Sequence, residues 1–296
     1  MTKNHLSRRS ILAGGVAGAA ATAVAASSDK AVAQSRPAAP AINRNLPDVV
    51  VVGAGAFGGW TALSLREAGA KVTLVDQYGA GNIRGSSGGE SRNIRASYGS
   101  REIYTRMATA AAGLWTEREE EFKRRLIYKN GSLRVLESDE LRAQLEIFDR
   151  LNLSYEMLDA AEIHRRWPQL RFEEDEQVFF EQGTGIVKAR EAMIAVDEVF
   201  VQKGGESRIG LARMGQSAGG RLQNILVDDQ PLSAGAFVFA CGPWLPQVLP
   251  DALTGYIAAP RSELFYIGSA PGDERYRAEN VPNISDQYTF TSADLG

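Results

Sequence analysis

The sequence predicts an α/β fold, because a strand, a glycine-rich turn and a helix follow one another near its start. Four consecutive valines at residues 49–52 form a buried-strand run, and the pattern Gly-x-Gly-x-x-Gly comes directly after it. Gly53 allows the tight turn, Gly55 lets a pyrophosphate approach the backbone, and Gly58 lets the helix pack closely on the sheet. This order is typical of a Rossmann-like dinucleotide-binding unit.

A second apolar run over residues 72–75 completes the unit and ends at an acid, Asp76, twenty-one residues after Gly55. A carboxylate at the tip of this strand can accept both hydroxyls of an adenosine ribose. The helix N-terminus presents free N–H groups and a positive dipole end to the phosphates. The combination favours dinucleotide binding over a purely structural glycine turn.

The composition is that of a globular protein, with 44% hydrophobic and 23% charged residues and a net charge of −3. There is no basic excess, so we expect no nucleic-acid partner. Cys241 is the single cysteine, which excludes an intrachain disulfide. The two histidines are His5 and His164. So few histidines give little support to a His-rich metal site or a Ser-His-Asp triad, and we expect no metal.

The first 33 residues are expected to be a targeting segment. Arg8 and Arg9 precede an Ala/Gly-rich apolar stretch over residues 11–26, and an A-x-A cleavage site ends the segment. The alternative is a transmembrane anchor, for which the stretch is short and weakly hydrophobic. The pattern resembles a twin-arginine export signal and predicts a periplasmic or other extracytoplasmic location, reached through the twin-arginine machinery. Residues 34–46 read as a linker.

Hydrophobic periodicity and turn residues predict the remaining elements. They are helices over residues 101–125, from Ser138, over 159–167 and over 190–203, and strands over 126–128, 133–136, 177–181, 222–227 and 237–240. The strands 126–128 and 133–136 flank Asn130-Gly131, which indicates a hairpin. Ser138 and Asp159 are placed to N-cap their helices. The order predicts two interleaved domains, with a discontinuous nucleotide domain and strands that return to the first sheet.

Five pieces in this order resemble the FAD-dependent oxidoreductases of the D-amino-acid-oxidase superfamily, and within it the monomeric sarcosine oxidase and N-methyltryptophan oxidase branch. The resemblance covers about residues 48–265. The pieces are residues 49–76, 85–99 (GSSGGESRNIRASYG), 166–168 (RWP), 183–187 (GTGIV) and 239–244 (FACGPW).

The resemblance implies FAD as cofactor and two parts of the chain. Residues 47–125 and 183–256 are expected to form the FAD-binding domain, and residues 126–182 and 257–296 an inserted, β-rich substrate domain. Members of this branch continue beyond the length of this chain, so we expect the C-terminal part to be missing here.

The activity implied by the resemblance is oxidation of a C–N bond in an amino acid or N-alkyl amino acid. Hydride would pass to the flavin, the imine would hydrolyse, and oxygen or another acceptor would reoxidise the cofactor. Two alternatives stay open at this point: a nicotinamide-dependent dehydrogenase of the same fold, and a non-catalytic exported fragment that binds nucleotide.

Arg92 and Arg95 are the candidate catalytic residues. Oxidation of an amino acid on a flavin needs a fixed cation for the carboxylate and a positive group near the ring. A spacing of three would place both on one face of a helical turn. By resemblance, Arg92 lies against the flavin and Arg95 grips the substrate carboxylate; the alternative is a pair of surface arginines.

Ser86 and Ser87 stand where this branch often carries histidines, and they either contact the cofactor or only form a turn. The resemblance also favours a buried, apolar role for Cys241 over covalent flavin attachment. The expected cofactor contacts are Gly53, Gly55, Ala56, Phe57, Gly58, Asp76, Gln77, Ser86, Ser87, Arg92 and Gly242.

Overall fold

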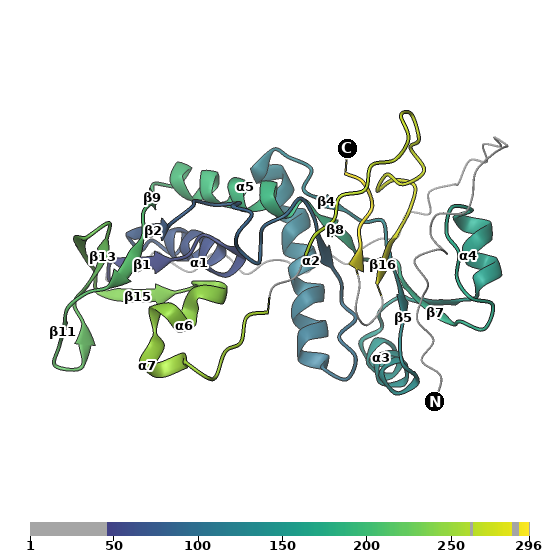
Figure 1. Cartoon of the computed structure of the whole chain (residues 1–296), viewed down its shortest axis with the longest axis horizontal. Coiled ribbons are helices and arrows are strands. Elements are labelled where there is room, and N and C mark those ends of the chain that lie inside the picture. The colour runs from purple at the N-terminus through teal and green to yellow at the C-terminus, as the bar shows by residue number, and fades with distance from the viewer. Residues whose placement is uncertain (1–45, 261–262, 286–289, 296) are drawn as a thin grey trace.

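The computed structural model describes residues 46–260, 263–285 and 290–295 (Figure 1). The predicted export signal, and the predicted linker before Leu46, lie outside the described residues. Figure 1 shows an elongated arrangement with one sheet near each end and the long helix α2 (Glu102–Phe122) between them. Among the helices that the structure describes, none combines the length and hydrophobicity needed to cross a membrane.

The first sheet confirms the predicted α/β fold. Its four strands are parallel and lie in the order β15-β1-β2-β9. Their bounds are β1 (Val49–Val52), β2 (Val72–Asp76), β9 (Glu206–Ile209) and β15 (Ala236–Phe239). Helix α1 (Ala56–Glu67) connects β1 to β2, and β9 and β15 come back from much later in the chain. The strand over 237–240 therefore returns to the first sheet as expected, and β9 pairs with β2 at the other edge.

Both faces of β1 are covered, which explains its unbroken valine run. Val49 and Val51 belong to a core shared with α1 and with α5 (Ala189–Gln202). Val50 and Val52 point the other way, because side chains alternate along a strand. They contact an antiparallel sheet in the order β10-β13-β14, through the fully buried Ile225. Its strands are β10 (Ala212–Met214), β13 (Asn224–Val227) and β14 (Gln230–Ser233).

Short elements complete this half of the molecule. They are the two-stranded sheet of β11 (Ser217–Ala218) and β12 (Arg221–Leu222), the single turn η1 (Gly242–Trp244), α6 (Leu245–Val248) and α7 (Pro250–Leu253).

The second large sheet has five strands in the order β17-β16-β5-β7-β6. The bounds are β5 (Ser132–Val135), β6 (Glu156–Leu158), β7 (Val178–Glu181), β16 (Asn283–Ser285) and β17 (Phe290–Thr291). Helices α3 (Ser138–Leu151) and α4 (Ala160–Arg166) accompany it. Leu133, Ile163 and Val178 are buried together in its core. A three-stranded sheet joins β3 (Arg92–Ile94), β8 (Gly185–Val187) and β4 (Ile127–Tyr128). The domain boundaries given above stay a prediction.

The predicted hairpin around Asn130-Gly131 is wrong. β4 pairs with β8, whereas β5 pairs with β7 and β16, so the two strands belong to different sheets. Gly131 has the positive φ of 79° that its pattern suggested. Its N–H donates to the carbonyl of Thr184 at 2.9 Å instead of closing a turn on β4. The chain uses the glycine to pass from one sheet to the next, because distant strands occupy both edges.

One of the two predicted N-caps is wrong and one is confirmed. Ser138 is not an N-cap: Glu137 holds that position, and its side chain makes no capping bond. Asp228 and Asp229 turn the chain, at φ values of 47° and 64°, into strand β14. Asp159 does cap α4, since its carboxylate accepts from the N–H of Glu162 at 2.8 Å.

Candidate dinucleotide and substrate site

The turn after β1 packs as the glycine spacing predicts. Gly53 has a φ of 106°, a conformation that side chains with a Cβ rarely adopt. A Cβ on Gly58 would overlap the carbonyl oxygen of Gly53 and lie 2.9 Å from its carbonyl carbon. The same atom would lie 3.2 Å from the Cβ of Ala240 on the neighbouring strand end. The start of α1 therefore approaches the sheet as closely as backbone atoms allow.

The N-terminus of α1 can receive an anion. Gly55 is the N-cap, and it has no side chain that could accept a hydrogen bond from the N–H groups of the first turn. The amides of Phe57 and Gly58 have no acceptor within the helix, because no turn precedes them. The amide of Ala56 is bound from outside, by the hydroxyl of Ser87 at 2.9 Å. The Phe57 side chain is 87% exposed, so the surface over this turn is open.

Asp76 ties the turn to the end of β2. One carboxylate oxygen accepts from the N–H of Ala54 and the other from the N–H of Tyr78, both at 2.8 Å. A carboxylate has about four acceptor positions, so two stay available for ribose hydroxyls. Gln77 follows directly and is exposed. Asp76 therefore shapes the phosphate turn in addition to the role expected of it.

The arginine segment meets this turn through Ser87. Arg92 lies in β3, where its guanidinium donates to the carbonyl of the exposed Ser86 from Nε at 3.2 Å and from Nη2 at 3.1 Å. A further bond runs from Nη1 to the carbonyl of Ser91 at 3.1 Å. These bonds hold the cation in one orientation beside the glycine turn.

The expectation that Arg92 and Arg95 share a helical face is wrong. Residues 92–94 form an antiparallel ladder with β8, and Arg95 follows directly. Side chains three apart in an extended segment point to opposite sides. Arg95 instead lies with its guanidinium 5.1 Å from the ring of Tyr98. Burial, and after it the charge of Arg95, lowers the pKa of Arg134, so these two cations are neighbours.

A cavity of about 770 Å³ opens beside the arginine segment, lined by Ile83, Gly89, Glu90, Glu263, Leu264, Phe265 and Tyr266. Arg92 borders it, because Nη1 is 3.4 Å from where a Cβ would stand on Gly89. The Tyr266 hydroxyl accepts from the N–H of Glu90 at 3.4 Å. Residues 263–266 were not predicted to line a site. Their one sequence signal is an apolar run that the structure leaves exposed.

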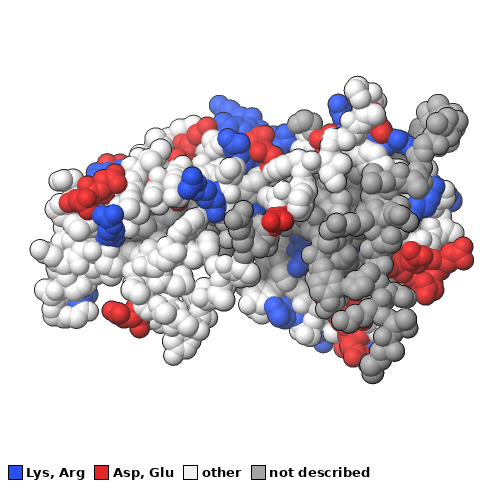
Figure 2. Space-filling view, viewed as in Figure 1, with Lys and Arg blue, Asp and Glu red and all other residues white. Residues whose placement is uncertain are grey.

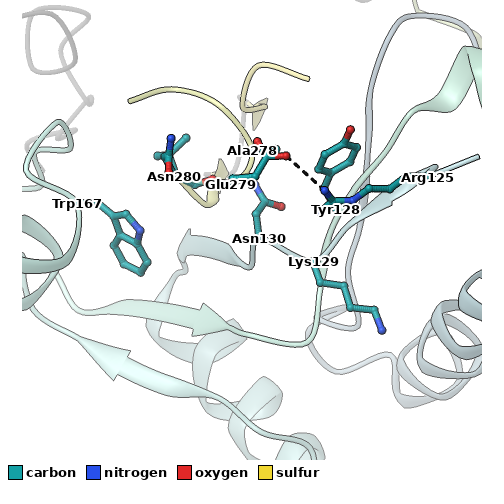
Figure 3. A pocket seen from close by; sticks show the side chains of 9 residues that line it. Arg125, Tyr128, Lys129, Asn130, Trp167, Ala278, Glu279 and Asn280 are labelled. Atoms are coloured by element: carbon teal, nitrogen blue, oxygen red, sulfur yellow. Dashed lines mark hydrogen bonds and ion pairs between the residues drawn. The ribbon is translucent and has the colours of Figure 1, made fainter. Parts of the chain in front are cut away.

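A smaller cavity of about 250 Å³ contains none of the predicted site residues. Figure 3 shows Arg125 and Tyr128 on one side of Ala278, Glu279 and Asn280, and Val281 also lines the cavity. Arg125 pairs with Glu279 at 3.5 Å and lies 4.1 Å from the ring centre of Tyr128. Over the described part of the face in Figure 2, acidic and basic side chains are interspersed.

Cys241 and Gly242 lie at the end of β15. The Cys241 thiol donates to the carbonyl of Val52 at 3.6 Å. Burial, with the negative charge of Asp76, raises its pKa to about 11, so it is a neutral thiol at neutral pH. Gly242 is exposed, with a φ of 50°. Its strand end adjoins the glycine turn, since the amide of Ala240 donates to Val52 at 2.8 Å.

The comparisons with known proteins place the chain in a family. The FAD dependent oxidoreductase family (DAO) matches residues 48–292, and the chain belongs to it. Human peroxisomal sarcosine oxidase is 29% identical over 71% of this chain and 54% of its own length. Monomeric sarcosine oxidase of Streptomyces avermitilis is 29% identical over 79% of this chain and 62% of its own length. N-methyl-L-tryptophan oxidase of Citrobacter koseri is 28% identical over 49% and 40%.

Solved structures agree with this assignment. NikD, an unusual amino acid oxidase of nikkomycin biosynthesis, is similar at a TM-score of 0.60 and 26% identity, over 69% of this chain and 53% of its own. L-proline dehydrogenase from P. horikoshii shares the fold at a TM-score of 0.66 and 16% identity, over 84% and 67%. The matches cover between 40% and 67% of the length of these relatives.

The predicted family and its cofactor, FAD, are thus confirmed, and the nicotinamide alternative gains no support. The residues at the turn fit the adenosine diphosphate half of that cofactor. The open first turn of α1, the two free acceptor positions of Asp76 and the close packing at Gly58 are what a dinucleotide needs. The individual contacts, including those of Ser86, Ser87 and Gly242, stay predictions.

Proposed function

We propose that the protein oxidises a C–N bond in an amino acid or N-alkyl amino acid, with FAD as hydride acceptor. One observation carries the proposal: the hydroxyl of Ser87 binds the amide of Ala56 at 2.9 Å. This bond joins the segment that holds Arg92 and Arg95 to the helix end that fits a pyrophosphate. The cation proposed to bind the carboxylate would therefore belong to the same structural unit as the dinucleotide turn.

Arg95 would bind the substrate carboxylate with two parallel N–H bonds, which a guanidinium offers and an ammonium does not. The ring of Tyr98 limits the orientations open to it. Arg92 is already fixed by the carbonyls of Ser86 and Ser91 and would place a positive charge where negative charge develops. When bound, FAD supplies the hydride acceptor and passes the electrons to oxygen or another acceptor.

The first experiment is to purify the protein and record its absorbance. A bound flavin gives bands near roughly 370 and 450 nm. The second is to supply N-methylglycine, N-methyl-L-tryptophan and L-proline in turn and follow loss of the band near roughly 450 nm without oxygen. A colourless protein that also fails to take up added FAD would remove the proposal. A yellow protein that none of a wide panel of amino acids and amines reduces would remove the substrate class.

We also propose that the protein is exported through the twin-arginine pathway with its cofactor already bound. Arg8 and Arg9 precede an apolar stretch, and the twin-arginine pathway moves folded proteins, often with a cofactor already bound. Replacing both arginines by lysine in the full chain should retain the protein in the cytoplasm. Equal amounts of wild type and variant in the periplasmic fraction would contradict this route.

A further inference from the structure

The backbone of residues 96–99 is buried without being part of a helix or strand. Ala96, Ser97 and Gly99 are all buried, and the segment connects β3 to α2 directly after Arg95. Buried backbone N–H and C=O groups need partners, and here no sheet ladder supplies them. The Tyr98 carbonyl accepts from the N–H of Arg101 at 3.1 Å, and three other groups are held by side chains from the second large sheet and its helix α3.

Three buried side chains hold three backbone groups of this segment. Glu181 comes from β7, Arg134 from β5 and Gln144 from α3, and their exposures are 2%, 6% and 0%. The bonds are Ala96 N–H to Glu181 Oε1 at 2.6 Å, Arg134 Nη1 to the Ser97 carbonyl at 3.2 Å and to the Ser97 hydroxyl at 3.1 Å, and Gly99 N–H to Gln144 Oε1 at 2.7 Å.

Removing one partner from these contacts destabilises the protein strongly, because the buried polar group that remains has neither water nor another hydrogen-bond partner. Burial raises the pKa of Glu181, and the hydrogen bonds from Ala96 and Ser97 oppose this rise. The nearby charges of Arg134 and Glu181 stabilise each other. Arg134 also donates to the hydroxyl of Ser285 in β16 at 3.2 Å, so β16 is joined to the same group.

We propose that Glu181, Arg134 and Gln144 are positioning residues that act as a clamp on residues 96–99 and thereby set the place of Arg95 and Tyr98. The role of Arg95 in this statement rests on the proposed function, whereas the clamp itself does not. A long guanidinium binds a carboxylate bidentately only if its backbone and its supporting ring are fixed. The clamp fixes both, because the segment it holds begins one residue after Arg95 and contains Tyr98.

Gln144 offers the sharpest pair of variants. Its amide nitrogen has no hydrogen-bond partner among the described residues, so Gln144→Glu keeps the acceptor for Gly99 without breaking another bond. Gln144→Met keeps the approximate volume and removes the acceptor. Glu181→Leu, which removes the acceptor for the Ala96 amide, and Glu181→Gln, which keeps an acceptor, form a second pair. Ser132→Ala is the matched control: Ser132 is fully buried on β5, and its hydroxyl has no partner among the described residues.

The first readout is hydrogen–deuterium exchange of the peptide that contains residues 96–99, in the full protein. Gln144→Met should speed exchange of the Gly99 amide about tenfold, and Glu181→Leu that of Ala96. Gln144→Glu and Glu181→Gln should restore most of the protection, and Ser132→Ala should leave it unchanged. Equal exchange in wild type and in the two acceptor-less variants would overturn the clamp.

The second readout is the affinity of the flavin-loaded protein for acetate, a bare carboxylate, followed through the visible flavin spectrum. The acceptor-less variants should bind acetate about 10- to 100-fold more weakly, because a displacement near 1 Å has costs of this order. The conservative variants should recover the affinity. Faster exchange with unchanged acetate affinity would overturn the positioning role. A colourless wild type would count against the proposed function, and exchange would then decide the inference alone.

Discussion

Replacing Gly58 by alanine tests the close contact on which the dinucleotide turn depends. The added Cβ would lie 2.9 Å from the carbonyl carbon of Gly53, where ordinary contact begins at 3.4 Å, and it would overlap the carbonyl oxygen. The shortfall at the carbon alone is 0.5 Å. The obstacle is backbone on the far side of a tight turn, so no side chain can rotate away. Helix α1 must therefore move off the sheet.

The expected cost is that of overpacking a core, about 1–3 kcal/mol in the free energy of unfolding. For a protein of this size each kcal/mol shifts the melting temperature by about 2–4 °C. The same displacement moves the first turn of α1, so FAD affinity should fall as well. The measurements are thermal unfolding and FAD titration of apoprotein.

Gly113→Ala is the matched control. Gly113 lies inside α2, and nothing stands within 4 Å of where its Cβ would be. Alanine there should raise stability by about 0.5–1 kcal/mol, because glycine loses more backbone freedom on folding. The two substitutions are chemically identical and should have opposite signs. Equal melting temperatures for wild type and Gly58→Ala, with full FAD binding, would refute the reasoning.

Four further predictions follow from the site. Asp76→Asn should weaken FAD binding about 10- to 100-fold through lost acceptor capacity, measured by flavin fluorescence; unchanged affinity would exclude Asp76 as a cofactor contact. Arg95→Ala should raise KM for carboxylate substrates about 10- to 100-fold. Arg142→Ala, on the exposed side of α3, should leave KM unchanged. Equal kinetics for wild type and Arg95→Ala would exclude Arg95 from the site. Cys241, with a pKa of about 11 against an ordinary 9.0, should react with iodoacetamide at pH 8 about 100-fold more slowly in the native than in the urea-unfolded protein. Rapid labelling of the native protein would contradict the raised pKa of this half-buried thiol. Burial raises the pKa of Glu181 above its ordinary 4.5, so the native state keeps a proton that the unfolded state loses, and this contribution to stability declines as the pH rises above about 4.5. Glu181→Gln should flatten this decline in urea midpoints measured above that pH, and parallel curves would show that Glu181 does not contribute to it.

The sequence by itself determined the dinucleotide unit. The valine run, the spacing of Gly53, Gly55 and Gly58 and the acid at the end of β2 are short-range features. Their consequences follow from sterics and hydrophobic periodicity within about thirty residues of chain. The sequence of residues 85–99 likewise shows the family resemblance by itself, and the family match agrees with it.

Only the tertiary structure decided how the arginine segment is arranged. Arg92 and Arg95 do not share a helical face because β8, more than ninety residues later, pairs with residues 92–94. β8 also pairs with β4, on its other edge, so β4 does not form the expected hairpin. The partners of residues 96–99 also come from distant elements. A strand's partner depends on which edges of the folded chain are free, and no local pattern records that. The glycine turn was therefore readable in advance, whereas the surroundings of Arg95 were not.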